Sequence, residues 1–264
     1  MSVAARGIGL TLGDREILRA VDFDARPGEV TAIVGPNGSG KTTLLRALTG
    51  ELAARGEVTL NGVPVAARNA TALALQRAVL PQAARLAFPF KVIEVVRMGL
   101  RAGPHARRPQ LAERALAAVG LGGYGGRFHQ ELSGGEQQRM HLARVLCQVW
   151  EPVLDGRPCW LFLDEPVASL DIGHQLAVMG LARDYARQGG GVVAVMHDLN
   201  LTAMFADRVA LMKAGRMLAQ GPAPEVFTDA LLGAAYGCAL RANVAPEGPV
   251  PFILPQAAGL AHSP

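Results

Sequence analysis

The 264-residue chain has few cysteines, few aromatic residues and no long hydrophobic run. Its three cysteines, Cys147, Cys159 and Cys238, are odd in number and lack CxxC spacing, so we expect a reducing compartment with neither a disulfide framework nor a zinc site. No apolar run approaches the ~20 residues that a membrane-spanning helix needs. Arg6 and Asp14 interrupt the N-terminal apolar stretch, so we expect no secretory signal. Together these absences predict a soluble, cytoplasmic protein.

Lysine is also scarce, because arginine supplies 23 of the 26 basic residues, and the net charge is only +4. An excess of this size over the whole chain gives no reason to expect a nucleic-acid partner. Half of the residues are hydrophobic, which is ample for a packed core. The length suits one large domain or one domain with a subdomain.

Two kinds of strand pattern alternate with helical segments. Three segments have the pattern of antiparallel strands, and they lie at 1–30, 57–65 (with Asn61-Gly62 as a hairpin turn) and 208–219. Three apolar runs are typical of strands buried on both faces of a parallel sheet, and they lie at 30–34, 159–163 and 192–196. Helical patterns lie at 41–52, 111–119, 134–148 and 172–188. We therefore expect an α/β core with an antiparallel β portion and a helical insertion.

A glycine-rich segment follows the first buried run. Residues 35–43 fit the pattern GxxxxGK[ST] between a predicted strand and a predicted helix, and only about 0.002 chance matches are expected from this composition. Glycines let backbone N–H groups surround a phosphate, and the helix N-terminus adds partial positive charge. Lys41 would bind the β- and γ-phosphates, and Thr42 would ligate Mg²⁺. The predicted nucleotide site consists of Gly35, Pro36, Asn37, Gly38, Ser39, Gly40, Lys41, Thr42 and Thr43.

The other two buried runs also end in polar residues. Asp164 and Glu165 follow one run, and His197 follows the other. Because ligands bind at the carboxyl ends of strands in open parallel sheets, we expect these side chains to meet the glycine loop. Asp164 suits a Mg²⁺ role, Glu165 a general base for water, and His197 a group that positions the γ-phosphate. Taken singly, the acidic pair is equally explained as a helix cap and the histidine as a structural side chain.

The segment LSGGEQQR at 132–139 opens a predicted helix. Ser133 is the expected N-cap and Glu136 completes a capping box, which is a sufficient structural explanation for both. Gly134 and Gly135, however, weaken a helix start unless the backbone must approach a ligand closely. Glycine amides at a helix N-terminus also favour an anion. The segment is therefore a second candidate phosphate contact.

These motifs occur in the order and spacing of the ATPases of ABC transporters, which the chain resembles over residues 3–240. The resemblance is carried by GPNGSGKTT, by Gln82 in Leu80-Pro-Gln, by LSGGEQQR, CWLFLDEP and Ser169-Leu-Asp171, and by His197. It implies a P-loop NTPase core of the RecA type with an antiparallel β subdomain, formed by residues 1–83 and 150–240. Residues 84–149 would form an inserted helical subdomain that bears the signature motif, and residues 241–264 a C-terminal tail.

The resemblance also implies that ATP is hydrolysed with Mg²⁺ and that two copies of the chain pack head to tail. Four residues of the signature segment would then contact ATP held by the partner chain, namely Ser133, Gly134, Gly135 and Glu136. The implied catalytic residues are Glu165, His197, Lys41 and Gln82. The implied Mg²⁺ residues are Thr42, Gln82 and Asp164. Asp171 would lie at the homodimer interface.

Closer likeness indicates the class of transporter. Residues 80–90, 92–99 and 148–158 resemble the haem (haemin) importer ATPases of Gram-negative bacteria, whereas 197–201 and 225–236 fit the wider iron-chelate and vitamin B12 importers. The prediction is an ATPase of haem import, with a siderophore or B12 importer as the alternative. A non-transport ABC ATPase acting on DNA or ribosomes is disfavoured, because the chain lacks a long coiled-coil insertion, zinc cysteines and a second ATPase core.

Membership of that group would set the partners and the location of the subunit. The expected partners are two copies of a transmembrane permease and a periplasmic substrate-binding protein, with no nucleic acid and no direct contact with the transported substrate. The expected location is the cytoplasmic face of the inner membrane. Residues 85–114 carry seven basic and two acidic residues, and this segment is expected either to face the permease or anionic lipid, or to be a solvated helical face.

Three local expectations complete the sequence analysis. Residues 11–14, Thr-Leu-Gly-Asp, offer no aromatic ring where the family often stacks one on adenine, so base selectivity is expected to be loose. The segment after the acidic pair reads Pro-Val-Ala-Ser-Leu-Asp rather than the usual Pro-Thr-Ser-Ala-Leu-Asp, yet it retains Asp171. His105, His129 and His262 are expected to be exposed in loops.

Overall fold

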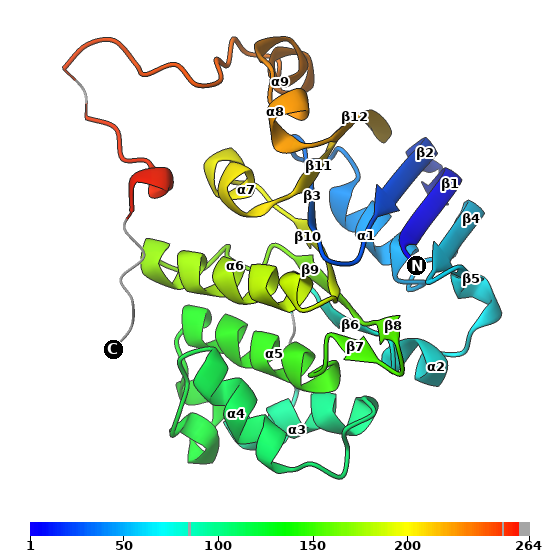
Figure 1. Cartoon of the computed structure of the whole chain (residues 1–264), viewed down its shortest axis with the longest axis vertical. Helices are drawn as coiled ribbons and strands as arrows, with labels where there is room; N and C mark the ends of the chain where they lie inside the picture. The colour runs from blue at the N-terminus through cyan, green and yellow to red at the C-terminus, as the bar shows by residue number, and fades with distance from the viewer. Residues whose placement is uncertain (84–85, 250, 259–264) are drawn as a thin grey trace.

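The computed structural model describes residues 1–83, 86–249 and 251–258, and it has the α/β architecture predicted from the sequence (Figure 1). A central six-stranded sheet has the order β12-β11-β3-β10-β9-β6, in which every neighbouring pair is parallel except β11 and β12. Its strands are β3 (Val30–Val34), β6 (Arg77–Leu80), β9 (Trp160–Asp164), β10 (Gly191–Val195), β11 (Arg208–Lys213) and β12 (Arg216–Gly221). The three buried apolar runs thus form adjacent parallel strands.

A second, antiparallel sheet has the order β2-β1-β4-β5. Its strands are β1 (Val3–Leu12), β2 (Arg15–Ala25), β4 (Arg55–Leu60) and β5 (Val63–Pro64). Asn61 and Gly62 join β4 to β5 with φ values of +53° and +76°, as a type I′ turn requires. Helix α1 (Lys41–Leu48) packs against strands of both sheets, and its Leu44 and Leu48 are buried among them.

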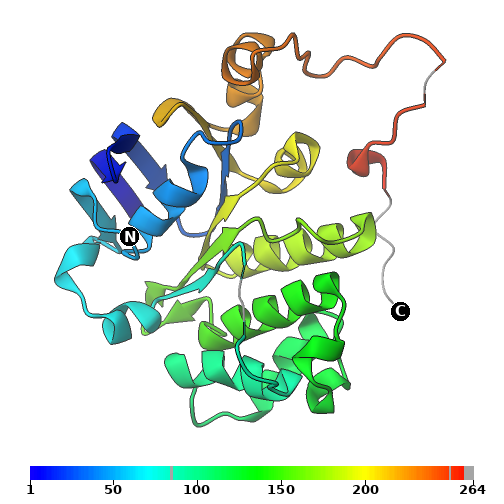
Figure 2. The ribbon, with the colours of Figure 1, turned by 180° about the vertical axis from the view of Figure 1, so that it is seen from behind.

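Three helices, α3 (Val92–Ala102), α4 (Gln110–Ala118) and α5 (Gly134–Gln148), pack against one another beside the central sheet (Figures 1 and 2). The sequence analysis did not identify α3, although its buried residues, Val92, Val95, Val96, Gly99 and Leu100, recur at helical spacing. Its glycine has a packing role: a Cβ at Gly99 would lie 1.9 Å from the Arg144 carbonyl oxygen of α5.

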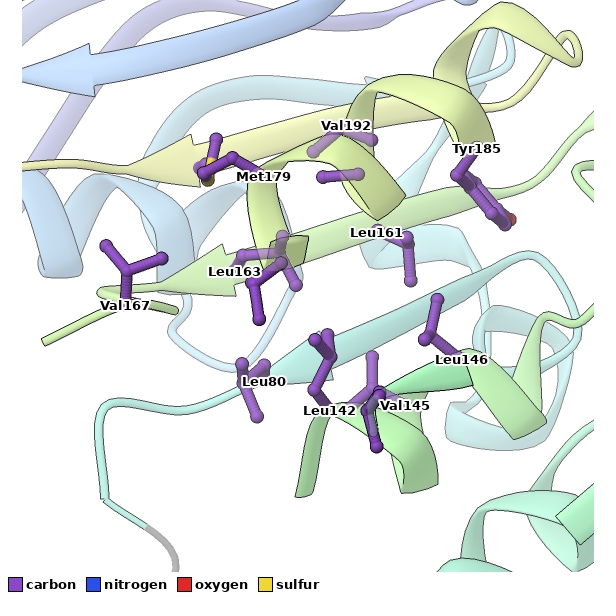
Figure 3. Close-up of a cluster of buried hydrophobic side chains, with 14 of the residues drawn as sticks. Leu80, Leu142, Val145, Leu146, Leu161, Leu163, Val167, Met179, Tyr185 and Val192 are labelled. Carbon is purple, nitrogen blue, oxygen red and sulfur yellow. The ribbon is translucent and has the colours of Figure 1, made fainter. Parts of the chain in front are cut away.

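Alternate side chains of the central strands enter two different cores. Trp160 and Phe162 of β9 pack on the α1 side, whereas Leu161 and Leu163 face the opposite side. There they meet α5 and α6 (Ile172–Arg187), and Figure 3 shows this cluster between the helices and β6, β9 and β10. Because both faces are covered, the strands show continuous hydrophobic runs instead of alternation.

The remaining elements are short and lie around this framework. They are α2 (Ala70–Ala74), β7 (Val153–Leu154), β8 (Arg157–Pro158), α7 (Leu199–Phe205), α8 (Ala223–Val226) and α9 (Asp229–Tyr236). After α9 the described chain is irregular except for a 3₁₀ turn at Pro255–Ala257, where Gln256 donates a hydrogen bond to the Asn200 carbonyl. Within the described ranges, none of the helices combines the length and the apolar character needed to cross a membrane.

The expectation that the loop histidines are exposed was wrong for both that the structure describes. His105 is 7% exposed and lies 4.0 Å from the Glu151 carboxylate, and His129 is 8% exposed with its Nδ1 3.4 Å from the Phe90 carbonyl oxygen. Both rings are covered because segments distant in sequence fold over them. His262, like Arg85 of the basic segment, lies outside the described residues.

Candidate functional site

The glycine-rich loop connects β3 to the first turn of α1. Lys41 begins the helix, and its ammonium donates hydrogen bonds to the carbonyls of Gly35 (2.8 Å) and Pro36 (3.1 Å). Burial lowers the pKa of Lys41, although Glu165 and Asp164 oppose the shift. Gly35 adopts a φ of +148°, and a Cβ there would lie 2.2 Å from the Met212 carbonyl oxygen, so no other residue fits.

Asp164 ends β9 next to the first turn of α1. Thr42 donates its hydroxyl hydrogen to Asp164 Oδ1 at 3.0 Å, and the aspartate is only 3% exposed. Burial raises the pKa of this carboxyl, and the hydrogen bond from Thr42 opposes the shift. A hydroxyl and a carboxylate oxygen are therefore adjacent beside the loop, which is a donor pair suited to a hard cation such as Mg²⁺.

Glu165 and His197 form the second polar pair. His197 Nε2 lies 2.6 Å from Glu165 Oε1, although the two residues follow different strands. The Glu165 side chain is 16% exposed and that of His197 43%. Glu165 has a φ of +53°, an uncommon value for a non-glycine residue, and Gln138 of α5 donates to its carbonyl oxygen at 3.4 Å. This backbone geometry holds the carboxylate at the edge of the sheet.

A cavity of about 950 Å³ unites these groups at the carboxyl edge of the sheet. Lys41, Thr42, Glu165 and His197 line it, and so does Gln82, which follows β6 and is exposed. The side chains that the sequence placed at strand ends therefore do meet the glycine loop, and Asp164 joins them through Thr42. The lining also includes residues that the sequence analysis did not single out as site residues, namely Asp14, Arg15, Glu16, Ile17, Arg19, Ala214 and Gly215.

The signature segment does not line this cavity. Ser133 caps α5, accepting from the Glu136 N–H at 3.3 Å, while the Glu136 carboxylate accepts from the Ser133 N–H at 2.8 Å. The hydrogen bonds that the Glu136 carboxylate accepts from the Ser133 N–H and hydroxyl lower the pKa of Glu136. Gly134 has open space where a Cβ would lie, whereas a Cβ at Gly135 would lie 3.0 Å from the Ser169 carbonyl oxygen. The capping box is present, and the first glycine of the helix is exposed.

Asp171 is exposed and caps α6. Its carboxylate accepts from the His174 N–H at 2.9 Å and contacts His174 Nδ1 at 2.8 Å. These bonds lower the pKa of Asp171. Like the signature segment, Asp171 is absent from the lining of its own chain's cavity.

The donor set around the cavity fits a magnesium–nucleotide complex. The Lys41 ammonium and the loop amides suit a polyphosphate, and Thr42 with Asp164 suits the cation. Within the described residues, no three His, Cys, Asp or Glu side chains cluster as a metal site.

Comparison with known proteins also indicates a nucleotide-binding protein. A family model described as ABC transporter matches residues 18–168. The hemin import ATP-binding protein HmuV of Jannaschia sp. (strain CCS1) is 59% identical, with 97% of this chain and 95% of that protein covered. The protein of the same name from Ruegeria sp. (strain TM1040) is 57% identical, with 98% and 99% covered.

The fold of the chain is also similar to those of solved structures. A metal-chelate type ABC transporter in an inward-facing conformation is 25% identical with a TM-score of 0.73, covering 89% of each chain. The ADP conformation of MJ1267, an ATP-binding cassette of an ABC transporter, is 23% identical with a TM-score of 0.75, covering 89% of this chain and 98% of that one. The chain therefore belongs to the ABC transporter family, as one of its ATP-binding ATPases.

Proposed function

We propose that this chain is the ATPase subunit of a haem importer. The observation that carries the proposal is the likeness, at 53–59% identity over nearly the whole chain, to proteins named hemin import ATP-binding protein. The cavity lined by Lys41, Thr42 and Glu165 supports it. The transported molecule would not touch this subunit, so the choice of haem rests on the relatives. A siderophore or vitamin B12 importer is the alternative outcome of the test below.

In the proposed hydrolysis, Glu165 takes the proton of the attacking water. His197, at 2.6 Å, orients its carboxylate and lies where it can contact the γ-phosphate. Lys41 would exchange its two carbonyl partners for phosphate oxygens. Thr42, Asp164 and Gln82 would hold Mg²⁺, which neutralises charge on the β- and γ-phosphates when it is bound.

A second copy of the chain would complete each site. Ser133, Gly134, Gly135 and Glu136 lie at an accessible helix N-terminus that has no role in their own chain's cavity. Such an end, with its partial positive charge, suits the γ-phosphate of ATP bound to a partner. Asp171 would lie in the interface between the copies. Residues 1–83 with 150–240, 84–149 and 241–264 would then be the core, the helical subdomain and a tail.

The helical subdomain is the proposed docking site for a transmembrane permease at the cytoplasmic face of the inner membrane. Two of its cations are engaged within the chain, because Arg108 pairs with Glu151 at 2.5 Å and Arg114 stacks on Trp150 at 5.1 Å. Arg101 and Arg107 are exposed and form no ion pair within the described part of the chain. A groove of about 480 Å³ lined by Lys91, Ile93, Arg97, Glu113, Leu116, Gly123, Gly125 and Gly126 lies on the same subdomain.

The substrate is tested by reconstitution. The chain is assembled in proteoliposomes with the permease encoded beside it, and ATP hydrolysis is measured with periplasmic binding proteins loaded with haem, a ferric siderophore or vitamin B12. We expect stimulation by the haem-loaded carrier alone. Stimulation by the siderophore-loaded or the B12-loaded carrier, with none by the haem-loaded carrier, would show that the importer transports that molecule and not haem.

Docking is tested with the double variant Arg101→Glu/Arg107→Glu. Charge reversal on a complementary interface should weaken co-purification with the permease about tenfold or more while leaving the ATPase of the isolated subunit unchanged. The matched control, Arg26→Glu/Arg187→Glu, reverses two exposed arginines outside this subdomain and should assemble normally. Unaltered assembly of the first variant would mean that these cations form a solvated face.

A further inference from the structure

A second cavity, of about 440 Å³, lies where the antiparallel sheet meets the central sheet, and its walls come from β2, β11 and β12. Two connections hold these strands in place around this inter-sheet cavity. The Arg19 N–H donates to the Gly215 carbonyl at 2.8 Å. The Asp24 N–H donates to Gln220 Oε1 at 3.2 Å, while Gln220 Nε2 donates to the Asp24 carbonyl. The cavity is therefore a fixed part of the folded framework.

The part of β2 that lines the inter-sheet cavity is irregular. Leu18 pairs with Leu10 and Val21 with Ile8, so β2 has one more residue than β1 between these two pairs. Ala20 takes a φ of +48° in this bulge, which is an uncommon conformation for a residue other than glycine, and it lines the cavity. Bulges redirect side chains and are over-represented next to functional sites, so this wall is a place to look for a ligand.

Three arginines line the inter-sheet cavity, one from each of its strands: Arg19 from β2, Arg208 from β11 and Arg216 from β12. Arg19 pairs with Glu16 at 3.3 Å. Among the residues that the structure describes, neither Arg208 nor Arg216 forms a hydrogen bond or an ion pair, and Nε of Arg208 is buried. A buried cationic donor without a partner is unfavourable, and it indicates a ligand that supplies the acceptor.

The two acidic side chains of the inter-sheet cavity already have partners outside it. Asp24 pairs with Arg6 at 2.8 Å, and Asp22 accepts from the Gly7 N–H at 2.8 Å. Neither Arg6 nor Gly7 lines the cavity. Because these carboxylates are held elsewhere, the two unpaired guanidinium groups are left for a ligand of negative charge.

We propose that the inter-sheet cavity binds a phosphate group, held chiefly by Arg208 and Arg216. A guanidinium group offers planar pairs of N–H donors that match the oxygens of a phosphate, whereas a lone carboxylate would use fewer of the donors that converge here. The volume admits free phosphate with water or a small phosphate monoester. The site is distinct from the glycine-rich loop, since Lys41 does not line it, and the inference does not depend on nucleotide hydrolysis.

The experiment titrates the full-length chain with inorganic phosphate in a calorimeter at constant ionic strength, with saturating Mg·AMP-PNP to occupy the glycine-rich loop. We expect binding at one site per chain, weakened about tenfold or more by Arg208→Gln and by Arg216→Gln, because each removes charge-assisted hydrogen bonds. Arg216 is exposed, so its variant should fold normally, and the Tm of each variant without phosphate checks this. The matched control, Arg26→Gln, changes an exposed arginine outside the cavity and should bind phosphate as the unaltered chain does.

A variant of the opposite sign separates binding from damage to the fold. Asp22→Asn removes a negative charge from the cavity wall and keeps an oxygen that can accept from the Gly7 N–H. Phosphate binding should therefore tighten about twofold to fivefold, as expected for the loss of one like charge near the surface. A structural defect would not produce such a gain.

Two other titrations identify the ligand class. Glycerol 3-phosphate binding more tightly than inorganic phosphate would assign the site to phosphate monoesters, and the reverse order would assign it to the free ion. Acetate binding as tightly as phosphate would overturn the inference, and so would no binding of either phosphate compound or equal binding by both arginine variants. Failure to bind Mg·AMP-PNP would instead refute the proposed nucleotide site, whereas the Arg208 and Arg216 variants would still report on the inter-sheet cavity.

Discussion

Replacing Glu165 by glutamine should lower kcat strongly while changing the stability of the folded chain only slightly. Loss of a general base lowers kcat by about 10²–10⁴, which is about 2.7–5.4 kcal/mol at 1.36 kcal/mol per factor of ten. The structural cost should be far smaller, because glutamine has the same shape and the Glu165–His197 pair is partly solvated, with side chains 16% and 43% exposed. Partly exposed pairs contribute about 1 kcal/mol or less, which shifts Tm by about 2–4 °C in a chain of this size.

The assay measures phosphate release under saturating Mg·ATP, together with Tm and gel filtration. We expect Glu165→Gln to lose steady-state turnover, to keep its Tm within about 4 °C and to accumulate as an ATP-bound dimer, because binding persists without hydrolysis. Glu57→Gln, at an exposed glutamate of β4, is the matched control and should behave as the unaltered chain. Turnover within twofold of the unaltered chain would refute Glu165 as the base.

Two further predictions concern buried positions. Because the native pKa of Asp164 is raised, its negative charge costs stability as pH rises above the ordinary carboxyl range, so Asp164→Asn should equal or exceed the unaltered chain in Tm at pH 7 while losing Mg·ATP hydrolysis. The Tm of Asp164→Asn minus the Tm of the unaltered chain should therefore rise between pH 4 and pH 7. A fall in this difference over the same range would contradict the prediction. Gly99→Ala should destabilise by about 1–3 kcal/mol in urea unfolding because its Cβ would meet α5, whereas Gly180→Ala, with open space in α6, should stabilise by up to about 1 kcal/mol. Equal effects of the two substitutions would show that the close helix contact does not exist.

Features that depend on a few adjacent residues could be predicted from the sequence. The Asn61-Gly62 turn, the Ser133–Glu136 capping box and the glycine loop before Lys41 are local, since each is specified by backbone preferences and hydrogen bonds over a few residues. The buried runs were also recognisable, because strands covered on both faces must be continuously apolar. The convergence of Lys41, Glu165 and His197 then followed from the rule that parallel strands end at one edge.

The tertiary structure decided what depends on distant partners. The burial of His105 comes from Glu151 and the fold around it, and the need for glycine at position 99 comes from the Arg144 carbonyl on another helix. Likewise, Arg15 and Gly215 are 200 residues apart in the sequence, yet both line the same cavity. Local sequence fixes the conformation of each element, whereas only packing decides which elements meet. The chain therefore encoded its nucleotide-binding chemistry in short motifs, whereas the full lining of the cavity exists only in the folded protein.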